Sequence, residues 1–506
     1  MVTVSADNRR LSFRHPLIGS AVVELATASE RRRAHQALAD VLRDQSERRA
    51  WHLGEAAMGP DETVAALLEE AARRRLRRGD ALGAVAALTR AAGLSPSTAH
   101  ESRRLAEAAY VGVDSGGELD DASRLLAGAR LVRPTTGQQS LHAAAASAFL
   151  LINRDGDIDT AYRLLVGAIE AGDHGWDASD TALVEALHLL VLLCWYGGTP
   201  DLFPPLFAFV DRLTPEPPEL LWVITRTFSD PSRIGAAALP RLAEPIATVR
   251  DEPTRVIRVG TASVFTDRLG DFRWATRRLV EQARAGTAPV RRHLGALMHL
   301  GPDYYHLGRW NNAAQLAVEG QTLCADHDYR FYAWHFHYIQ AVVAAARGDA
   351  ETSAALTEEI VRWATPRRAH GARFFAGHAR ALAALGDGDP EAAYQHACAL
   401  SAPGTVTPYV PIAMWGAMDL VEAALRTGRN EEAAAHASAM RASAMAELSS
   451  RLELMVLACE DCAGGGDGDF GIGTRLSPKG AAGALRLPPV NTATPHSIGT
   501  TRSIRH

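Results

Sequence analysis

Apolar and polar positions follow the period of amphipathic helices along most of the chain, and glycines interrupt this pattern at regular intervals. Apolar residues recur at spacings of three and four, which is typical of a helix with one buried face. A glycine followed by Asp, Arg or Glu recurs with a small residue five positions later. The eight pairs are Gly79/Ala84, Gly117/Ala122, Gly156/Ala161, Gly270/Ala275, Gly308/Ala313, Gly348/Ser353, Gly388/Ala393 and Gly428/Ala433.

The spacing of these glycines indicates a repeat array. Successive glycines are 38, 39, 114, 38, 40, 40 and 40 residues apart. The interval of 114 corresponds to three periods of 38, so two repeats between Gly156 and Gly270 lack the pattern. Gly198 and Gly235 lie near the expected places but have no alanine five positions later. We therefore predict stacked helix pairs, nine or ten in number, because one pair cannot bury its apolar face alone.

Each residue of the pattern has a local physical role in such a pair. The glycine can adopt the left-handed conformation that ends the first helix. An aspartate that follows it can accept a hydrogen bond from the start of the second helix. These aspartates are Asp80, Asp157, Asp271, Asp349 and Asp389. The small residue lets the two helices approach closely.

The first fifty residues follow a different pattern. Val2-Thr-Val-Ser and Leu11-Ser-Phe-Arg flank a polar Asp-Asn pair, which predicts a short β-hairpin. A helix is predicted from about Pro16, because proline is favoured in a first helical turn. A second helix is predicted over residues 29–42.

The glycine repeats resemble the tetratricopeptide (TPR) motif, although their period exceeds its usual 34 residues. Three copies match the second half of that motif. They are Gly79-Asp80 with Ala84, Leu88, Ala91 and Pro96; Gly117 with Ala122, Leu126, Ala129 and Pro134; and Gly156 with Ala161, Leu165 and Ala168. Later copies keep only the glycine and the small residue. The resemblance implies an all-α, TPR-like superhelix of helix pairs, an α-solenoid.

Two further phrases resemble the large LuxR-type transcriptional regulators of actinobacteria, which are MalT-like signal-transduction ATPases of the STAND class. The phrases are Phe13-Arg-His-Pro-Leu, which closes a winged-helix region in that family, and Arg49-Ala-Trp-His-Leu, which opens its helical arm. The resemblance covers about residues 10–460. It implies a winged-helix remnant and connecting helices over 1–55, a helical repeat domain over 56–462, and a tail over 463–506.

The composition agrees with a large folded protein and limits its chemistry. Of 506 residues, 47% are hydrophobic and 22% are charged, and the net charge of −5 gives no broad case for nucleic-acid or membrane binding. Lys479 is the single lysine. Because Lys479 lies between proline and glycine, the sequence contains no Walker-type phosphate loop, and lysine-based catalysis is excluded outside the tail.

The tail and the cellular compartment follow from composition. Residues 463–506 are rich in glycine, proline and threonine and have no apolar period, so they are predicted to be disordered. The family's LuxR-type helix-turn-helix is not recognisable there, which suggests a shifted reading frame or a degraded gene. The N-terminus has no apolar signal core and no segment is long enough to span a bilayer, so a cytoplasmic protein is expected.

A cluster of aromatic residues and histidines is the candidate effector or partner surface. Its residues are Tyr304, Tyr305, His306, Phe331, Tyr332, Trp334, His335 and Tyr338. They lie on predicted first helices, which line the concave surface of a solenoid, where a maltotriose-like sugar, a peptide or a protein partner could bind. The alternative is that these rings simply fill the space between long helices.

Other candidate sites have ordinary structural explanations. The arginine run at 73–78 follows Glu69 and Glu70 at the spacing of a solvated, ion-paired helix face. Cys459 and Cys462 form an isolated Cys-x-x-Cys without a second ligand pair. No nucleophile motif or zinc signature is present, so no catalytic residue, cofactor or metal is predicted.

Two functions remain open from the sequence. The first is the regulatory arm of a LuxR-type transcriptional regulator, which senses an effector or binds a protein partner and contacts DNA only through a missing or separately encoded helix-turn-helix. The second is a stand-alone TPR-like scaffold for protein–protein interaction. An enzyme is not expected, because no catalytic constellation stands out.

Overall fold

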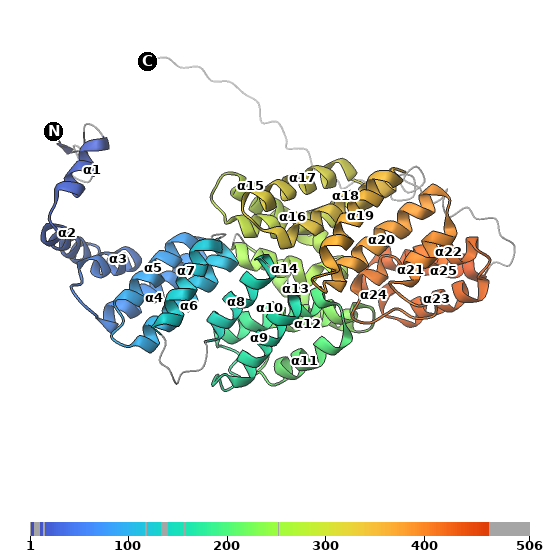
Figure 1. The fold of residues 1–506 in the computed structure, drawn as a ribbon, viewed down its shortest axis with the longest axis horizontal. Helices are drawn as coiled ribbons and strands as arrows, with labels where there is room; N and C mark the ends of the chain where they lie inside the picture. The colour runs from blue at the N-terminus through green and yellow to red at the C-terminus, as the bar shows by residue number, and fades with distance from the viewer. Residues whose placement is uncertain are drawn as a thin grey trace, which may run out of the picture. The chain divides into compact units, whose positions relative to one another are not determined.

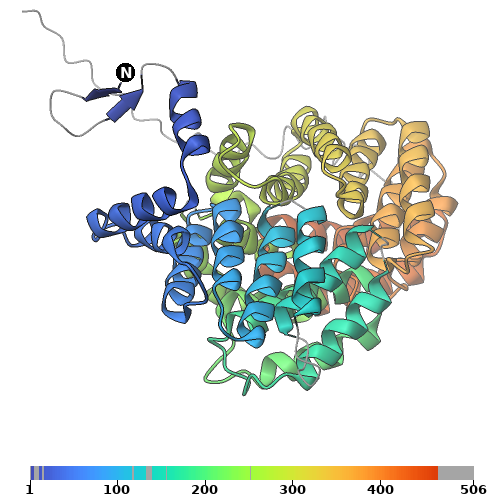
Figure 2. The same cartoon turned by 60° about the vertical axis from the view of Figure 1, so that its left-hand side comes forward.

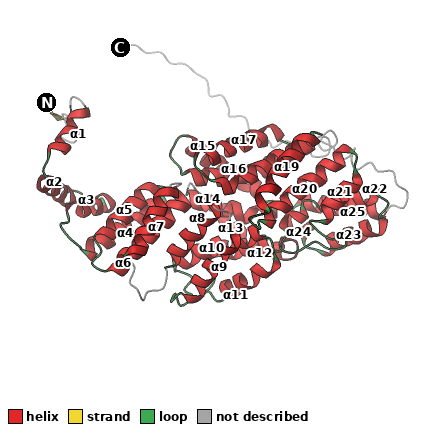
Figure 3. Ribbon diagram, viewed as in Figure 1, coloured by secondary structure: helices red, strands yellow, loops and turns green. Residues whose placement is uncertain are grey.

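Helices make up nearly all of the residues that the computed structural model describes (Figure 3). The described residues are 2–4, 11–13, 16–116, 119–132, 140–154, 157–250 and 252–464. The predicted all-α fold of helix pairs is confirmed within them. None of the described helices combines the length and apolar character that crossing a membrane requires. The predicted disordered tail lies outside the described residues beyond Gly464, and the predicted domain boundaries stay predictions.

The N-terminal segment contains the predicted hairpin. Strand β1 (Val2–Val4) pairs antiparallel with β2 (Leu11–Phe13). Helices α1 (Pro16–Leu25), α2 (Ala28–Val41) and α3 (Ser46–Ala56) follow. The start of α2 is fixed by a capping box, in which the side chains of Thr27 and Glu30 bond reciprocally to each other's backbone N–H. Whether the hairpin and α1 belong to a winged helix stays a prediction.

Twenty helices, α4 to α23, form ten consecutive pairs (Figures 1 and 2). The first helices of the pairs are α4 (Glu62–Arg77), α6 (Thr98–Val111), α8 (Leu141–Arg154), α10 (Thr181–Gly197), α12 (Glu219–Ser229), α14 (Pro253–Ser263), α16 (Val290–His306), α18 (Ala333–Ala346), α20 (His370–Asp387) and α22 (Ala417–Arg426). The second helices are α5 (Ala81–Gly93), α7 (Leu119–Leu131), α9 (Ile158–Ala171), α11 (Phe203–Asp211), α13 (Pro231–Ala247), α15 (Arg273–Arg284), α17 (Trp310–Asp326), α19 (Ala350–Ala364), α21 (Pro390–Cys398) and α23 (Asn430–Ala442).

Short elements connect or follow these pairs. A π-helical turn, η1 (Gly112–Gly116), directly continues α6. The 3-10 turns are η2 (Pro200–Leu202), η3 (Val264–Thr266), η4 (Leu269–Phe272), η5 (Arg330–Tyr332) and η6 (Pro411–Met414). Helices α24 (Met445–Leu448) and α25 (Ser450–Gly464) follow the tenth pair.

Five of the repeat glycines make the same turn between the helices of a pair. Gly79, Gly308, Gly348, Gly388 and Gly428 all have positive φ, between 69° and 83°. In each case the glycine N–H bonds to the carbonyl three residues earlier, and the next N–H bonds to the carbonyl five residues before it. This is the Schellman motif, which satisfies the last carbonyls of the first helix. The predicted role of these glycines is therefore confirmed.

The caps and small residues of the pattern also take their predicted places. The carboxylates of Asp80, Asp157, Asp349 and Asp389 accept a bond from a backbone N–H three residues later. All eight small residues are at most 3% exposed, so each lies at the contact between helices.

The turn expected at Gly270 and the cap expected at Asp271 are corrected by the structure. Gly270 lies inside η4, and Asp271 beside it caps no helix. The left-handed residue of that repeat is Asp267 instead, at φ 55°. Gly235 lies inside α13, where an added Cβ would be 2.8 Å from Leu448 Cδ2, so close packing explains the glycine. The two repeats without the pattern are present as α10/α11 and α12/α13.

The first helices form a continuous inner row and also meet across it. From α6 to α22, each first helix contacts the first helix of the next pair. Helix α10 additionally contacts α20, which lies five pairs later, and η1 contacts α16. Ion pairs and backbone hydrogen bonds also join segments that are far apart in the sequence. Arg451 bonds to Asp267 at 2.8 and 2.9 Å, and the N–H of Tyr409 donates to the Ser229 carbonyl at 2.6 Å.

Glu69, which was predicted to lie on a solvated helix face, is buried instead. Glu69 is only 6% exposed, and it accepts bonds from Arg103 at 2.7 Å and from the buried Arg104 at 2.9 Å. These guanidiniums hold the pKa of Glu69 at about 2 against the opposing effect of burial. The side chain of Glu70 is 42% exposed and pairs with Arg74 at 3.0 Å, as predicted for the solvated face. Tertiary contacts from α6 therefore convert one half of the acidic pair into a core ion pair.

Candidate functional site

The predicted aromatic cluster lies on the inner row of helices. Tyr304, Tyr305 and His306 form the end of α16, Phe331 and Tyr332 lie in η5, and Trp334, His335 and Tyr338 lie in α18. Six of the eight are at most 8% exposed, and Tyr305 and His306 are half-buried. A protein partner could not contact most of these side chains without opening the fold. Their role as an effector or partner surface stays a prediction.

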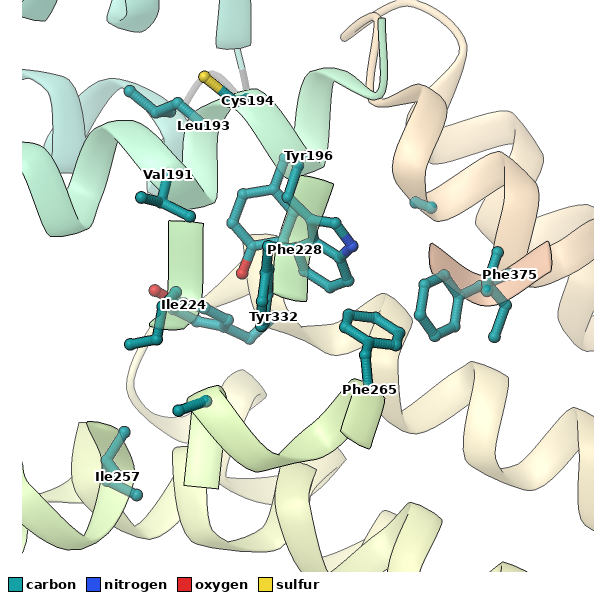
Figure 4. Close-up of a cluster of buried hydrophobic side chains, with 14 of the residues drawn as sticks. Val191, Leu193, Cys194, Tyr196, Ile224, Phe228, Ile257, Phe265, Tyr332 and Phe375 are labelled. Atoms are coloured by element: carbon teal, nitrogen blue, oxygen red, sulfur yellow. The ribbon is translucent and has the colours of Figure 1, made fainter. Parts of the chain in front are cut away.

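The rings of α18 pack against rings from helices far away in the chain. The Trp334 and His335 rings stack with centroids 3.7 Å apart. The Tyr338 ring meets Phe375 of α20 edge-on, with centroids 4.7 Å apart. Figure 4 shows Phe228 and Phe265 in the same cluster, carried by other segments of the chain. The edge-on geometry of the Tyr338–Phe375 pair is a favourable one for aromatic rings.

A cavity of about 120 Å³ opens within this cluster, and we call it the aromatic cavity. Its walls come from α10, α12, α14, η3, α16, η5, α18, α20 and the residue after η6. Its ring-bearing residues are Trp195, Tyr196, Phe228, Phe265, His299, Tyr332, His335, Tyr338, Phe375 and Trp415. Tyr332, His335 and Tyr338 are thus the sequence-predicted residues that the structure brings to it.

The other five predicted residues lie outside the lining of this cavity. Trp334 and Phe331 pack behind it; the Phe331 ring meets Tyr196 edge-on, with centroids 4.6 Å apart. His306 packs edge-on against Trp415, with ring centroids 4.8 Å apart. Tyr304 is buried within α16.

Sequence reasoning missed most of the cavity wall. Trp195 and Tyr196 belong to an apolar run that is typical of any buried helix, so their pattern carried no functional signal. Phe228, Phe265 and Phe375 are far apart in the sequence, and only the packing of the inner row brings them together.

A second cavity of about 70 Å³ adjoins the first, and we call it the charged cavity. Its polar lining consists of Tyr110, Asp114, Glu185, His188, Thr254, Arg258, Thr261, Arg291 and Arg292. Asp114 comes from the π-helical turn η1, and such turns are frequent at functional sites. Leu192, Ile257, Thr261 and Arg291 line both cavities, so the two spaces share one wall.

The charges of this second cavity form ion pairs between distant helices. Glu185 bonds to Arg258, and it accepts a bond from the Tyr110 hydroxyl at 2.9 Å. Asp114 bonds to Arg292 and lies 3.7 Å from the Nη2 atom of Arg291. These contacts join η1 and α10 to α14 and α16.

Burial keeps the histidines at the cavities neutral at pH 7. It lowers the pKa of His299 to about 4, and that of His335 and His188 to about 3, because a charged imidazolium would lose its hydration. Among the described residues, His335 Nε2 and His299 Nδ1 have no hydrogen-bond partner. The aromatic cavity therefore presents neutral polar atoms on an otherwise apolar wall.

A row of three polar side chains leads from the aromatic cavity towards α22. The Tyr338 hydroxyl lies 3.0 Å from His378 Nδ1, and His378 Nε2 lies 3.7 Å from Asp419 Oδ2. Burial raises the pKa of Tyr338 well above its ordinary value and the pKa of Asp419 to about 8. Neither group carries a charge at neutral pH, so the row serves to position the Tyr338 ring in the wall.

Nowhere among the described residues do three His, Cys, Asp or Glu side chains lie together as potential metal ligands. Cys459 is buried, Cys462 is half-buried, and neither forms a disulfide. In the arginine run at 73–78, Arg73 bonds to Glu69 at 2.5 Å and Arg74 bonds to Glu70 on the same helix, and Arg78 bonds to Glu47 of α3 at 2.6 Å.

Comparison with known proteins found similarity to solved structures alone. No protein-family model and no curated protein matches the chain. A STAND protein with a tetratricopeptide repeat sensor, PH0952 from Pyrococcus horikoshii, is 12% identical with a TM-score of 0.32, and the match covers 76% of this chain and 54% of that chain. The chain thus spans about half the length of that protein.

Two other structures show a comparable level of similarity. A chain of the APC/C hetero-tetramer Cut9–Hcn1 is 14% identical with a TM-score of 0.32, and 88% of this chain and 93% of that chain are covered. The TPR domain of P58(IPK) is 13% identical with a TM-score of 0.22, and 79% of this chain and 99% of that chain are covered.

Proposed function

We propose that this protein is a non-enzymatic regulatory arm that senses a small effector in the cytoplasm, as part of a LuxR-type, MalT-like transcriptional regulator system. The phrases Phe13-Arg-His-Pro-Leu and Arg49-Ala-Trp-His-Leu, together with the helix pairs that follow them, support the family assignment. DNA would be reached only through a separately encoded helix-turn-helix, and a protein partner would transmit the signal.

The observation that carries the sensing role is the aromatic cavity. Its volume of about 120 Å³ is comparable to the roughly 150 Å³ of an engineered apolar cavity that binds benzene. A single aromatic ring or a branched aliphatic group fits this space, whereas a trisaccharide or a peptide needs far more room. The proposed effector is therefore smaller than the maltotriose-like or peptide ligand that the sequence suggested.

The position of the cavity makes it suitable for regulation. A ligand there would contact first helices from α10 to α20 at once, including the contact between α10 and α20 that bridges five pairs. A ligand shifts a conformational equilibrium by its difference in affinity for two states. Binding would therefore favour the closed arrangement of the inner row, and a partner could recognise that arrangement.

The proposal excludes catalysis by the cavity residues for a chemical reason. A general acid or base works best with a pKa near the operating pH. Burial moves the pKa of His299 to about 4 and raises that of Tyr338 well above its usual range. These side chains bind and orient a ligand without exchanging protons at pH 7.

A stand-alone scaffold is the second candidate function, and one observation favours it. Leu25 and Val41, on α1 and α2, are 84% and 81% exposed, and Val22 and Val23 are more than half exposed. Exposed apolar groups of this kind are suited to a protein partner. The neighbouring DNA separates the two functions: an adjacent frame that encodes a Walker motif or a LuxR-type helix-turn-helix supports the regulator, and the lack of both favours the scaffold.

The sensing role is tested with a matched pair of variants. Val264→Phe fills the aromatic cavity, and Val318→Phe makes the same change at an exposed position of α17. Melting temperatures are measured with a panel of small aromatic and branched aliphatic compounds, sugars and short peptides. We expect one or more of the small apolar compounds to stabilise the native protein and Val318→Phe but not Val264→Phe.

Two outcomes would contradict this proposal. Equal stabilisation of both variants would show that the compounds bind elsewhere. Conversion of a bound compound into a product, followed by mass spectrometry, would show an enzyme. The same purified protein should bind neither ATP nor operator DNA with nanomolar affinity.

A further inference from the structure

The wall shared by the two cavities suggests which chemical class of effector fits, an inference that rests on the proposed function. The apolar side is the aromatic cavity, and the polar side is the charged cavity. Arg291 is the charged residue that lines both. A ligand that occupies the aromatic cavity therefore lies beside a guanidinium at one end.

Among the described residues that line the charged cavity, positive charges outnumber negative charges by one. Three arginines, Arg258, Arg291 and Arg292, face two carboxylates, Asp114 and Glu185. His188 in the same lining is neutral because burial lowers its pKa to about 3. Buried charges are retained when a charged partner and hydrogen bonds compensate them, so the surplus favours an anion.

The carboxylates already present do not compensate Arg291 fully. Glu185 is occupied by Arg258 and by the Tyr110 hydroxyl. Asp114 is bonded to Arg292, and its nearest contact with Arg291 is 3.7 Å, beyond hydrogen-bond distance. Among the described residues, Arg291 is thus the arginine of this lining without a hydrogen-bonded carboxylate, and it lies on the wall of the aromatic cavity.

Aromatic rings hold the Arg291 side chain in this position. Its guanidinium carbon lies 4.9 Å from the centre of the Phe149 ring and 5.6 Å from that of Tyr332, which are cation–π distances. Its side chain is 11% exposed, and its Nε atom has no hydrogen-bond partner among the described residues. A buried guanidinium with an unused donor is well placed to bind a carboxylate.

We propose that the effector is a small amphipathic anion, with an aromatic or branched apolar body in the aromatic cavity and a carboxylate that accepts hydrogen bonds from Arg291. The apolar walls bind the body, and Arg291 selects the charge. A neutral compound of the same shape leaves Arg291 without its anionic partner, and a cationic one is repelled by it.

The test uses three probes that share one body and differ in charge. They are 3-phenylpropanoate, 3-phenylpropan-1-ol and 3-phenylpropan-1-amine, titrated calorimetrically into the full-length protein. We expect the carboxylate to bind at least about tenfold more tightly than the alcohol, because the buried guanidinium of Arg291 gains an anionic partner only when the carboxylate binds. The amine should bind most weakly.

Substitutions of Arg291 test whether the preference for the carboxylate depends on its guanidinium. Arg291→Met should weaken binding of the carboxylate about tenfold or more and leave that of the alcohol nearly unchanged. Arg291→Lys should retain part of the preference, because it keeps the charge. Arg277→Met, at an exposed position of α15, is the matched control and should bind all probes as the native protein does.

Several results would overturn the inference. Equal or tighter binding of the alcohol or the amine would exclude an anion-selective site, and so would undiminished carboxylate binding by Arg291→Met. A lack of heat with all three probes at millimolar concentration would exclude ligands of this size. If the alcohol binds and Val264→Phe abolishes its binding, the sensing role survives and only the anionic class is wrong. Because the probe series needs no variant, the inference stays falsifiable even if Arg291→Met does not fold.

Discussion

At the scale of single residues, burial determines what each polar side chain can do. His436 of α23 is 1% exposed, and neither of its ring nitrogens forms a hydrogen bond with another side chain among the described residues. Its burial lowers its pKa to about 4. His327, in the turn that follows α17, is exposed. Only the neighbours of His436 in space decide its protonation.

The buried histidines predict a loss of stability in mild acid. A histidine whose folded pKa is below its unfolded value of about 6.5 binds fewer protons when folded, so stability falls as the pH drops from 6.5 towards 4. For His436, with a pKa of about 4, the loss between pH 7 and pH 5 is about 2 kcal/mol.

This contribution is isolated by comparing two variants. His436→Leu should show a smaller loss of unfolding free energy between pH 7 and pH 5 than the native protein, by about 2 kcal/mol. His327→Leu, at an exposed position, is the control and should keep the native dependence. Urea denaturation at the two pH values measures the difference. An unchanged loss in His436→Leu would show that this imidazole is hydrated in solution.

At the scale of elements, the turn between the helices of a pair is encoded locally. A glycine in the left-handed conformation, a capping aspartate and a small residue one turn later are enough to specify it, so the sequence predicts these turns well. The prediction fails at Gly270, where Asp267 takes the left-handed conformation instead and bonds to Arg451 of α25.

The turn glycines predict a conformational penalty upon substitution. Gly348 has φ of 77°, and open space surrounds the position that a Cβ would occupy. Gly348→Ala should therefore lower the unfolding free energy by about 1–2 kcal/mol through backbone strain alone. Gly93→Ala is the control, because Gly93 ends α5 with ordinary φ and equally open space. That variant should be neutral or slightly stabilising.

This prediction is tested by measuring the urea concentration at the midpoint of unfolding for each variant. The slope of the unfolding free energy against urea concentration should be the same in all of them. Equal stability of Gly348→Ala and Gly93→Ala would show that the turn can relax without cost.

At the scale of the whole molecule, contacts across the inner row distinguish this fold from an open repeat array. In an ideal solenoid each repeat contacts only its neighbours, and unfolding can proceed repeat by repeat. Here one hydrophobic core runs from Ala106 to Cys459, and α10 contacts α20 within it. Helices α3 to α5 instead contribute to two smaller clusters, centred on Leu68 and Leu88.

This division predicts two levels of local stability. Native-state hydrogen exchange should show that the amides of α3–α5 open at a lower free energy than those of α10, α16 and α18. The latter should open together, because their side chains share the closed core. A gradual decrease of protection along the ten pairs would instead indicate an open array.

The sequence by itself determined the helix pairs, most of their turns and the buried small residues, because these depend on contacts within about forty residues. It also located three of the cavity residues, Tyr332, His335 and Tyr338. Only the tertiary structure decided that the aromatic cluster is buried, that Trp195 and Phe375 complete its cavity, and that Arg291 faces it. The reason is distance along the chain: these side chains meet through inner helices five pairs apart, and no local pattern encodes that meeting.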